Sequence, residues 1–448
     1  MGGDMLNAMK YISTVPFSGL FNWSVQYLND SKIAFSKAYP MMRIGDFLKR
    51  NKTAVSIEDD KTYKRATIKV RNGGIFLRDE EKGSNIGTKN QFLISKGQFL
   101  LSKIDARNGA FGVVPDVLDG GIITGNFWTF DVDYSIVNPH YLTLLTTTQA
   151  FVSFCEQASN GTTNRHYLQE PLFLNIKVPV PSLEEQNKLV EEYNKVIAKA
   201  EALVKECQEI DLSILRYFNK SVGLKQSTRQ VKLLSTMRYA DISNRWDPFA
   251  VTNGLSANVL IYPLGSFITD IATGTTPPTS KKEYFNGNVK FYTPSDISGR
   301  LYLAGSERTL TKKAIDDKKA RVFHKGDILF VGIGSTVGKV GIVRDEIVSS
   351  NQQITGFKLN TDLLYPEYAF YYLHYHKELT TAEHSKTTLP IVNQEKIANI
   401  PIPVPTISQQ KEMVEHMNHM REKIEELYKQ SIDCRRKSLK NFETQIFE

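Results

Sequence analysis

One stretch of the chain is rich in hydrogen-bond donors that suit phosphate oxygens. It runs from Ala272 to Phe285 and combines glycine turns, Thr and Ser hydroxyls and a pair of lysines. Hydroxyl and backbone N–H groups bind phosphate oxygens, and lysine adds a salt-dependent attraction. The candidate contacts in this stretch are Thr275, Thr276, Lys281, Lys282 and Tyr284. These residue types predict a surface that binds a polyanion.

Other side chains could read base edges, because Arg pairs with guanine while Asn and Gln pair bidentately with adenine. The first half of the chain offers Lys103, Arg107, Asn108 and Asn126, and the second half offers Gln352 and Gln353. Neighbouring polar loops add Thr162, Thr163, Asn164, Arg165, Ser335, Thr336, Lys339, Lys386 and Thr387. Any one of these is also what an ordinary polar turn contains. Two parallel sets in one chain favour nucleic-acid binding.

Patterns that would indicate catalysis are incomplete. Phe330 to Gly334 spells the F-x-G-x-G loop that holds S-adenosylmethionine in many amino methyltransferases. Such enzymes also need a D/N-P-P-Y/F loop, and the nearest sequence, Asn138 to Tyr141, lacks the second Pro. The phosphate loop G-x-x-x-x-G-K-[ST] fails because Val340 follows Lys339. We assign no catalytic or metal-binding residue, and a self-contained S-adenosylmethionine-dependent DNA methyltransferase remains an alternative.

Composition narrows the class of protein. The chain has 448 residues, of which 41% are hydrophobic and 23% charged, as in globular proteins of two to four domains. The net charge of +8 is consistent with an anionic partner. Three cysteines without C-x-x-C spacing predict neither a disulfide framework nor a zinc site. Because the chain shows no export signal and no long apolar run, we expect a cytoplasmic protein without a membrane span.

The elements that must position these side chains include a long helix. Ser182, followed by Glu184, Glu185 and Gln186, predicts a capped helix start. Apolar residues then recur at alternating steps of four and three over about four heptads, which indicates a coiled-coil seam that needs a partner helix. The seam comprises Leu189, Tyr193, Val196, Ala200, Leu203, Cys207, Ile210, Ile214 and Tyr217.

The partner helix is in the same chain. A second stretch near the C-terminus matches the first with a constant offset of 224 residues, which places Pro405 on Pro181 and Phe442 on Phe218. Its seam comprises Met413, Met417, Met420, Ile424, Leu427, Ser431, Cys434 and Ser438. An internal repeat of this kind predicts that the chain is built twice.

The segments before each helix also repeat in order. Arg43–Phe47 corresponds to Pro263–Phe267, Lys96–Leu100 to Lys325–Leu329, and Gly109–Val114 to Gly338–Val343. Short β-type runs between glycine turns dominate the first segment, with one helical stretch over Pro139–Gln157. We therefore predict an α+β fold of two mixed α/β domains with β-rich cores and two long helices that form an antiparallel coiled coil. The expected parts are residues 1–181, helix 182–222, linker 223–245, residues 246–405 and helix 406–448.

Several of these motifs resemble the specificity subunit of a Type I restriction-modification system. Gly274-Thr-Thr-Pro277, followed by Tyr284–Phe291, is similar to the opening of many target recognition domains in that family. Val178–Gln186 and Ile400–Gln410 resemble its signature for entry into the conserved helices. The first domain lacks the Gly-Thr-Thr-Pro opening and resembles another subgroup through Lys103–Gly112.

The resemblance implies a non-catalytic reader of double-stranded DNA. Each target recognition domain would read one half of a bipartite, asymmetric site. The helix pair, roughly 55–60 Å long at 1.5 Å per residue, would separate the halves. Two modification subunits would hold S-adenosylmethionine and methylate adenine, restriction subunits would use ATP and magnesium, and this chain would need no cofactor. The residues expected to dock these partners are Glu184, Glu185, Gln186, Gln409 and Gln410. A coiled-coil scaffold that binds no DNA is a further alternative.

Overall fold

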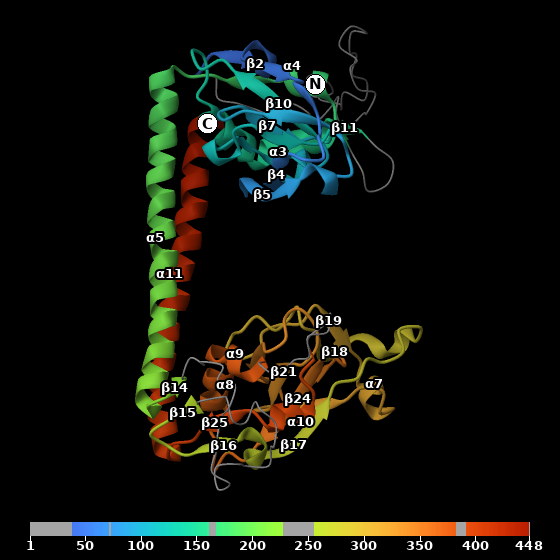
Figure 1. Ribbon diagram of the computed structural model, residues 1–448, viewed down its shortest axis with the longest axis vertical. Coiled ribbons are helices and arrows are strands. Elements are labelled where there is room, and N and C mark those ends of the chain that lie inside the picture. Colours follow the sequence, from blue (N-terminus) through green and yellow to red (C-terminus); the bar gives the residue numbers. More distant parts are fainter. Residues whose placement is uncertain (1–37, 71–72, 161–166, 227–254, 382–390, 448) are drawn as a thin grey trace, which may run out of the picture. The chain divides into compact units, whose positions relative to one another are not determined.

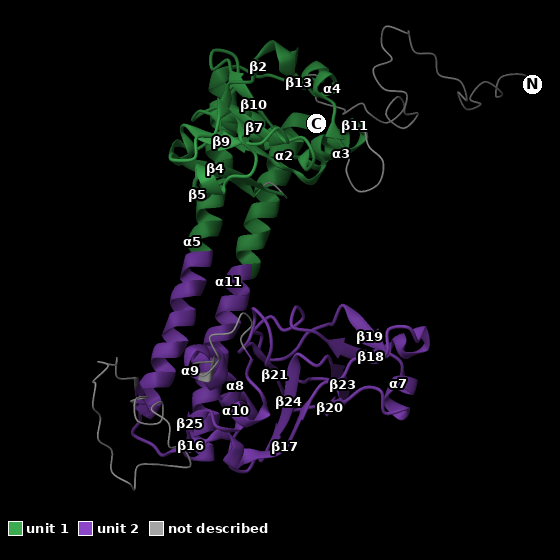
Figure 2. Ribbon diagram, turned by 45° about the vertical axis from the view of Figure 1, so that its right-hand side comes forward, with its two compact units in different colours: residues 1–203, 429–448 green, residues 204–428 purple. Residues whose placement is uncertain are grey.

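The computed structural model describes residues 38–70, 73–160, 167–226, 255–381 and 391–447. The chain divides into two compact units, residues 1–203 with 429–448 (unit 1) and residues 204–428 (unit 2), coloured separately in Figure 2. Two long helices, α5 (Leu183–Val222) and α11 (Ile407–Phe447), each contribute one part to either unit. Each unit is therefore a globular domain with its own segment of a helix pair.

Unit 1 contains two main sheets (Figure 1). The first has the order β2-β10-β7-β8 and the second the order β3-β6-β9-β4-β5. The strands are β1 (Met41–Arg43), β2 (Leu48–Asn51), β3 (Ala54–Ser56), β4 (Thr62–Lys69), β5 (Gly74–Lys82), β6 (Asn90–Ile94), β7 (Phe99–Ser102), β8 (Phe111–Val113), β9 (Gly121–Ile123), β10 (Phe127–Val132), β11 (Ser159–Asn160), β12 (Tyr167–Leu168) and β13 (Lys177–Pro179). The helices are α2 (Pro139–Thr147), α3 (Gln149–Gln157) and α4 (Glu170–Asn175), and a 3-10 turn, η4 (Ala106–Asn108), follows β7.

Unit 2 has the corresponding sheets β17-β24-β21-β22 and β19-β18-β23-β20. Its strands are β14 (Lys225–Gln226), β15 (Leu255–Ser256), β16 (Ile261–Pro263), β17 (Ile268–Thr273), β18 (Phe285–Tyr292), β19 (Arg308–Leu310), β20 (Val322–His324), β21 (Ile328–Val331), β22 (Val340–Ile342), β23 (Ile347–Ser350), β24 (Ile354–Leu359) and β25 (Pro401–Pro403). Its shorter helices are α7 (Lys312–Asp316), α8 (Pro366–Tyr375), α9 (Lys377–Thr381) and α10 (Gln394–Ala398), with the 3-10 turn η8 at Lys282–Tyr284.

The structure confirms the predicted repeat at the level of topology. Both first sheets have the same strand order, and both second sheets join one parallel pair, β4 with β9 and β18 with β23, to antiparallel neighbours. The turns that precede β7 and β21 are also the same, since Gly97 and Gly326 have φ values of 81° and 89° that L side chains rarely adopt. As far as the described residues show, unit 1 alone adds an edge strand, β3, to its second sheet.

One predicted helix is two helices. The sequence predicts a single helical stretch over Pro139–Gln157, but Thr148 has an extended backbone and separates α2 from α3. Its hydroxyl accepts a hydrogen bond from the N–H of Phe151 at 3.3 Å, so it acts as the N-cap of α3. The side chain of Asn138 caps α2 in the same way, through the N–H of His140 at 2.8 Å.

In unit 1 the predicted seam is the contact between the two long helices. Leu189 and Ala200 of α5 are buried. The hydroxyl of Ser431 donates to the carbonyl of Ala200 at 3.0 Å, and that of Ser438 donates to the carbonyl of Tyr193 at 3.5 Å. A step of seven residues forward in α5 matches a step of seven back in α11, so the pair is antiparallel. The two seam serines are compatible with burial because each donates to the facing helix.

Unit 2 contains an antiparallel pair in the same register. Cys207 Sγ lies 3.6 Å from the carbonyl oxygen of Ile424, and Tyr217 packs against the ring of His416 with centroids 4.2 Å apart. Met413, Met417 and Ile214 are buried in the core of this unit. The antiparallel coiled coil predicted from the heptads is therefore confirmed within each unit.

A buried glutamine joins the start of each long helix to its domain. In unit 1 the side-chain amide of Gln186 donates to the carbonyls of Ile136 and Pro181 at 3.0 and 2.8 Å, and its oxygen accepts from the N–H of Asn138 at 2.8 Å. Gln186 has no exposed surface. It is therefore unavailable to a partner protein, which corrects the expectation that it docks one.

Gln410 makes the same three contacts in unit 2. Its amide donates to the carbonyls of Leu363 and Pro405 at 3.0 and 2.9 Å, and its oxygen accepts from the N–H of Tyr365 at 2.8 Å. This side chain is also completely buried, so the expectation that Gln410 contacts a partner is wrong for the same reason. Of the other predicted docking residues, Glu184 is exposed and Glu185 half-buried. The exposed Gln409 accepts hydrogen bonds from the N–H and hydroxyl of Thr406 at the helix start.

The far end of each helix packs on the domain that the other helix leaves. In unit 1 the ring of Phe442, at the end of α11, lies 6.0 Å from that of Tyr141 in α2. In unit 2 Phe218, at the end of α5, lies 5.1 Å from Tyr368 in α8. The two tyrosine hydroxyls donate to the carbonyls of Pro179 and Pro403. Phe218 and Phe442, which the sequence repeat places at matching positions, thus have the same packing role in the two units.

Candidate nucleic-acid interface

Three segments of unit 2 that are distant in sequence meet where strands of its first sheet end. Gly332 directly follows β21, Gln353 precedes β24, and Val392 lies before α10. The N–H of Gly332 donates to the carbonyl of Gln353, and the N–H of Val392 donates to the carbonyl of Gly332, both at 2.8 Å. We call the meeting point of these three residues the unit 2 junction.

The unit 2 junction borders a pocket of about 340 Å³. Its polar lining includes Thr273, Gln352, Gln353, Thr355, Asn393 and Gln394. The amide of Gln394 donates to the hydroxyl of Thr273 at 2.9 Å, which ties α10 to the end of β17. Gln394 and Thr273 are not among the predicted contacts, although Thr273 lies inside the donor-rich stretch that begins at Ala272.

The two predicted glutamines are held by their oxygen atoms. The hydroxyl of Thr276 donates to Oε1 of Gln352 at 2.6 Å, and the side-chain amide of Asn351 donates to Oε1 of Gln353 at 3.0 Å. Among the described residues, no hydrogen bond engages the side-chain N–H groups of either glutamine. Gln352 is exposed, as is Thr275. The structure therefore brings together the beginning of the donor-rich loop and the two glutamines, as a base-reading surface requires.

Unit 1 has a junction with the same backbone contacts. The N–H of Lys103, directly after β7, donates to the carbonyl of Asn126 at 3.0 Å. The N–H of Leu168 in β12 donates to the carbonyl of Lys103 at 2.8 Å. Lys103, Asn126 and Leu168 define the unit 1 junction and follow one another in the chain in the same order as Gly332, Gln353 and Val392. The sequence predicts Lys103 and Asn126 as contacts but not that they meet.

The side chains at the two junctions differ in chemistry. Unit 1 carries Lys103 where unit 2 has Gly332, and the Lys103 ammonium lies 5.3 Å from the ring centroid of Tyr167. A Cβ atom on Gly332 would come within 2.6 Å of the carbonyl oxygen of Val392. Unit 1 therefore delivers a cation to its junction, whereas unit 2 has no room for a side chain there without a shift of the backbone.

Other predicted contacts lie on the loops beside the junctions. Arg107 and Asn108 belong to η4, in the loop between β7 and β8. The matching loop of unit 2, between β21 and β22, carries Ser335, Thr336 and Lys339. Asn108, Asn126 and Ser335 are exposed, and the others are half-buried. Thr162, Thr163, Asn164, Arg165, Lys386 and Thr387 lie outside the described residues.

The rest of the donor-rich loop divides into exposed and buried parts. Lys281 and Lys282 are exposed. Tyr284 is 3% exposed, packs with Phe291 and Leu310, and donates its hydroxyl to Asp317 at 3.1 Å. Burial and the neighbouring carboxylate raise the pKa of this phenol. Tyr284 is therefore a core residue of unit 2, which corrects the prediction that it contacts DNA.

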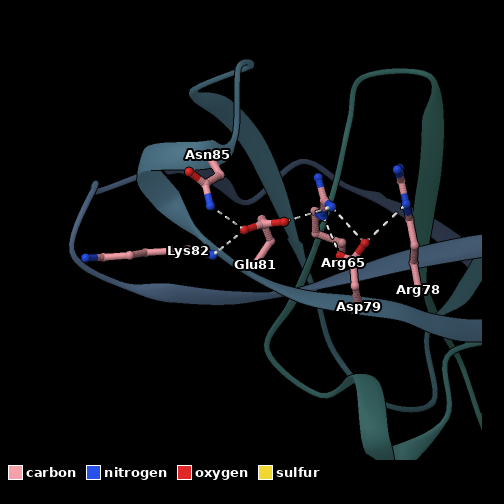
Figure 3. Close-up of polar contacts among 6 residues, drawn as sticks. All are labelled: Arg65, Arg78, Asp79, Glu81, Lys82 and Asn85. Carbon is pink, nitrogen blue, oxygen red and sulfur yellow. Dashed lines mark hydrogen bonds and ion pairs between the residues drawn. The ribbon is translucent and has the colours of Figure 1, made fainter. Parts of the chain in front are cut away.

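Not every cation in unit 1 is available to a phosphate. On the hairpin of β4 and β5, Arg65 forms two hydrogen bonds to Asp79, at 2.5 and 2.7 Å, and an ion pair with Glu81 (Figure 3). The guanidinium beside Asp79 lowers the pKa of that carboxyl group. Arg78 also lies 3.4 Å from Asp79 (Figure 3). The charge of Arg65 is therefore compensated by neighbouring carboxylates, and Arg78 shares one of them.

Within the ranges that the structure describes, no three His, Cys, Asp or Glu side chains are grouped so as to hold a metal ion. In the same ranges, no helix combines the length and the apolar composition that crossing a membrane requires.

Comparison with known proteins agrees with the duplicated architecture. The model of one family, the Type I restriction modification DNA specificity domain, matches residues 37–230 and again residues 262–433. The chain is 29% identical over 173 residues to the Type I restriction enzyme MjaIX specificity subunit of Methanocaldococcus jannaschii, across 37% of this chain and 38% of that relative. It is 22% identical over 403 residues to the MjaVIII specificity subunit of the same organism, across 86% of this chain and 87% of that relative.

A solved structure shares the fold. A chain described under "Structural basis underlying complex assembly and conformational transition of the type I R-M system" superposes with a TM-score of 0.51 at 17% identity, covering 92% of this chain and 97% of that one. The two stretches that match the family model make up well over half of the sequence and contain both junctions. The chain therefore belongs to the family of the Type I restriction modification DNA specificity domain, which it contains twice.

Proposed function

We propose that this chain is the DNA-reading subunit of a Type I restriction-modification complex and performs no catalysis itself. The observation that carries the proposal is the doubled family match on two domains whose junctions share backbone contacts but not side chains. Two copies of one frame with different polar groups suit the two halves of a bipartite, asymmetric site. Each unit would read one half-site.

In the proposed complex, direct readout takes place at the two junctions. Gln352 and Gln353 offer amide donors to bases, and Lys281 and Lys282 contact the phosphate backbone without sequence preference. Lys103, Arg107, Asn108 and Asn126 serve the other half-site. We propose that the length of α5 and α11 sets the number of unread base pairs between the half-sites.

The partners follow from the same proposal. Two modification subunits would bind S-adenosylmethionine and methylate adenine, and restriction subunits would use ATP and magnesium, in the cytoplasm. Glu184, Glu185 and Gln409 remain candidates for docking them, since their side chains lie at the helix starts and are not fully buried.

The proposal is tested by the DNA sequences that the chain, assembled with its partner subunits, selects from randomised double-stranded DNA. We expect a motif of two short half-sites at a fixed spacing. Replacement of residues 246–405 by the corresponding segment of another family member should change one half and leave the other intact. An unchanged motif after this exchange would refute the assignment of the half-sites.

A second measurement addresses the enzyme alternative. The purified chain alone, dialysed against labelled S-adenosylmethionine, should retain no stoichiometric ligand. The backbone N–H and carbonyl of Gly332, within the F-x-G-x-G sequence, bond to Gln353 and Val392, so this loop is already part of the junction. Stoichiometric retention would favour a self-contained methyltransferase.

A further inference from the structure

The junction of unit 1 has a lysine, Lys103, at a position where that of unit 2 has no side chain. Their backbone contacts are equivalent, so the positions can be compared one by one. Lys103 of unit 1 occupies the place of Gly332 in unit 2, and Tyr167 the place of Ile391, directly before Leu168 and Val392. The cation and the ring beside it therefore belong to unit 1 only.

Lys103 is held in place more firmly than a typical surface lysine. Its N–H and its carbonyl are both bonded to neighbouring loops, and the residue is half-buried. Its ammonium lies 5.3 Å from the centroid of the Tyr167 ring, within the distance at which a cation is attracted to an aromatic face. Among the described residues no carboxylate pairs with this ammonium, in contrast to Arg65, whose guanidinium is compensated by Asp79 and Glu81.

A positioned ammonium without a carboxylate selects for hydrogen-bond acceptors. Lysine has three donors and no acceptor, so it favours the base edge that presents only acceptors. In the major groove guanine presents two acceptors side by side, N7 and O6, whereas thymine presents one acceptor beside a methyl group, and adenine and cytosine present amino donors. Asn126, whose main-chain carbonyl accepts from the N–H of Lys103, is exposed, and its side-chain amide is a candidate contact for an adjacent base.

We propose that Lys103 is the specificity-determining residue by which unit 1 selects a guanine in its half-site, with Tyr167 as the positioning residue for its ammonium. This inference rests on the proposed function and adds to it the identity of one base. In unit 2, Gly332 stands in place of the lysine and offers no side chain for the same contact.

The test compares the DNA motifs selected by variants of the assembled complex from randomised double-stranded DNA. Lys103→Gln should lose the preference for guanine at one position of one half-site. Affinity for the wild-type site should fall by about 5- to 150-fold, the equivalent of ~1–3 kcal/mol for a base contact, while sites with another base at that position are bound as before. Lys103→Arg should keep guanine, because arginine makes the same contact. Tyr167→Leu should weaken the preference without changing the base.

Two results would overturn the inference while leaving the proposed function intact. If Lys103→Gln weakens binding to all sequences equally and lowers the salt dependence by about one phosphate contact, Lys103 binds the backbone instead. If the selected motif is unchanged, Lys103 reads nothing. Lys281→Gln is the matched control, because an exposed phosphate contact should show the uniform loss. A wild-type complex that selects no motif would refute the proposed function itself, and the inference with it.

Discussion

The glutamine that joins each long helix to its domain gives the sharpest prediction about stability. Replacement of Gln410 by Met keeps an unbranched side chain of similar length but removes both polar groups. The N–H of Tyr365 and the carbonyls of Leu363 and Pro405 then lose their partner. Each buried polar group left without a hydrogen bond costs ~1–3 kcal/mol. After allowance for the hydrophobic gain of methionine, we expect the free energy of unfolding of unit 2 to fall by about 3 kcal/mol.

Urea unfolding measures the loss in the free energy of unfolding. Hydrogen exchange with peptide resolution then shows which part of the chain is destabilised. The exchange of amides at the start of α8 and in the first turn of α11 should accelerate, while amides of unit 1 remain protected. Gln186→Met should give the converse pattern, with the effect confined to unit 1, because it makes the equivalent contacts there. Gln409→Met is the control for a neighbouring, exposed glutamine and should cost about 1 kcal/mol through its cap contacts with Thr406.

Gln410→Glu adds a pH test of the same site. The glutamate would keep an acceptor for Tyr365 but would place a second oxygen against the carbonyls of Leu363 and Pro405. Burial and these carbonyls should raise the pKa of the introduced carboxyl group in the folded state, so stability should fall as the pH rises through that pKa. The reasoning is refuted if Gln410→Met costs less than Gln409→Met, or if Gln410→Glu is equally stable at pH 4 and pH 8.

Three further predictions concern unit 2. Burial, and secondarily the charge of Arg421, lower the pKa of His374 to about 4. The free energy of unfolding should therefore fall by about 2–3 kcal/mol as the pH falls from about 6.5 to about 4. In unfolding experiments over this pH range, His374→Phe should lose that part of the pH dependence. Burial raises the pKa of Asp327, so the wild type should lose stability relative to Asp327→Asn as the pH rises above about 4. The same pH dependence of the free energy of unfolding in both proteins would contradict this. Lys282→Gln should lower the affinity for DNA of any sequence and reduce the slope of log K against log salt by about 0.9, as measured by fluorescence anisotropy at several salt concentrations.

The helical frame could be predicted from the sequence because its long-range contacts follow a local period. The heptad steps place Ala200 and Cys207 on one face whatever the partner, and the offset between the two stretches identifies Phe442 with Phe218. One signal was available and missed. Gln186 and Gln410 lie three residues before Leu189 and Met413, on the seam itself, and a polar residue at a seam position is a candidate for burial rather than for docking.

The junctions could be predicted only in part, because their contacts have no period. Lys103, Asn126 and Leu168 are brought together by strand order and by hydrogen bonds of main-chain atoms. Residue types made Lys103 and Asn126 candidates, but nothing local indicates that their backbones meet. The misplaced Tyr284 has the same origin, since the loop that leads to it is exposed while its ring packs in a separate small core.

The two kinds of contact explain how one frame can hold two readers. At the helix starts, side chains make the contacts, and the two copies have the same residue, Gln186 and Gln410. At the junctions, main-chain atoms make the contacts, and the side chains differ, as Lys103 and Gly332 do. The junction contacts of Lys103 are made by its main chain, so Lys103→Gln should leave the free energy of unfolding within about 0.5 kcal/mol of the wild type. If the junctions read DNA as proposed, the residue at position 103 can change the specificity of unit 1 without loss of the fold that presents it.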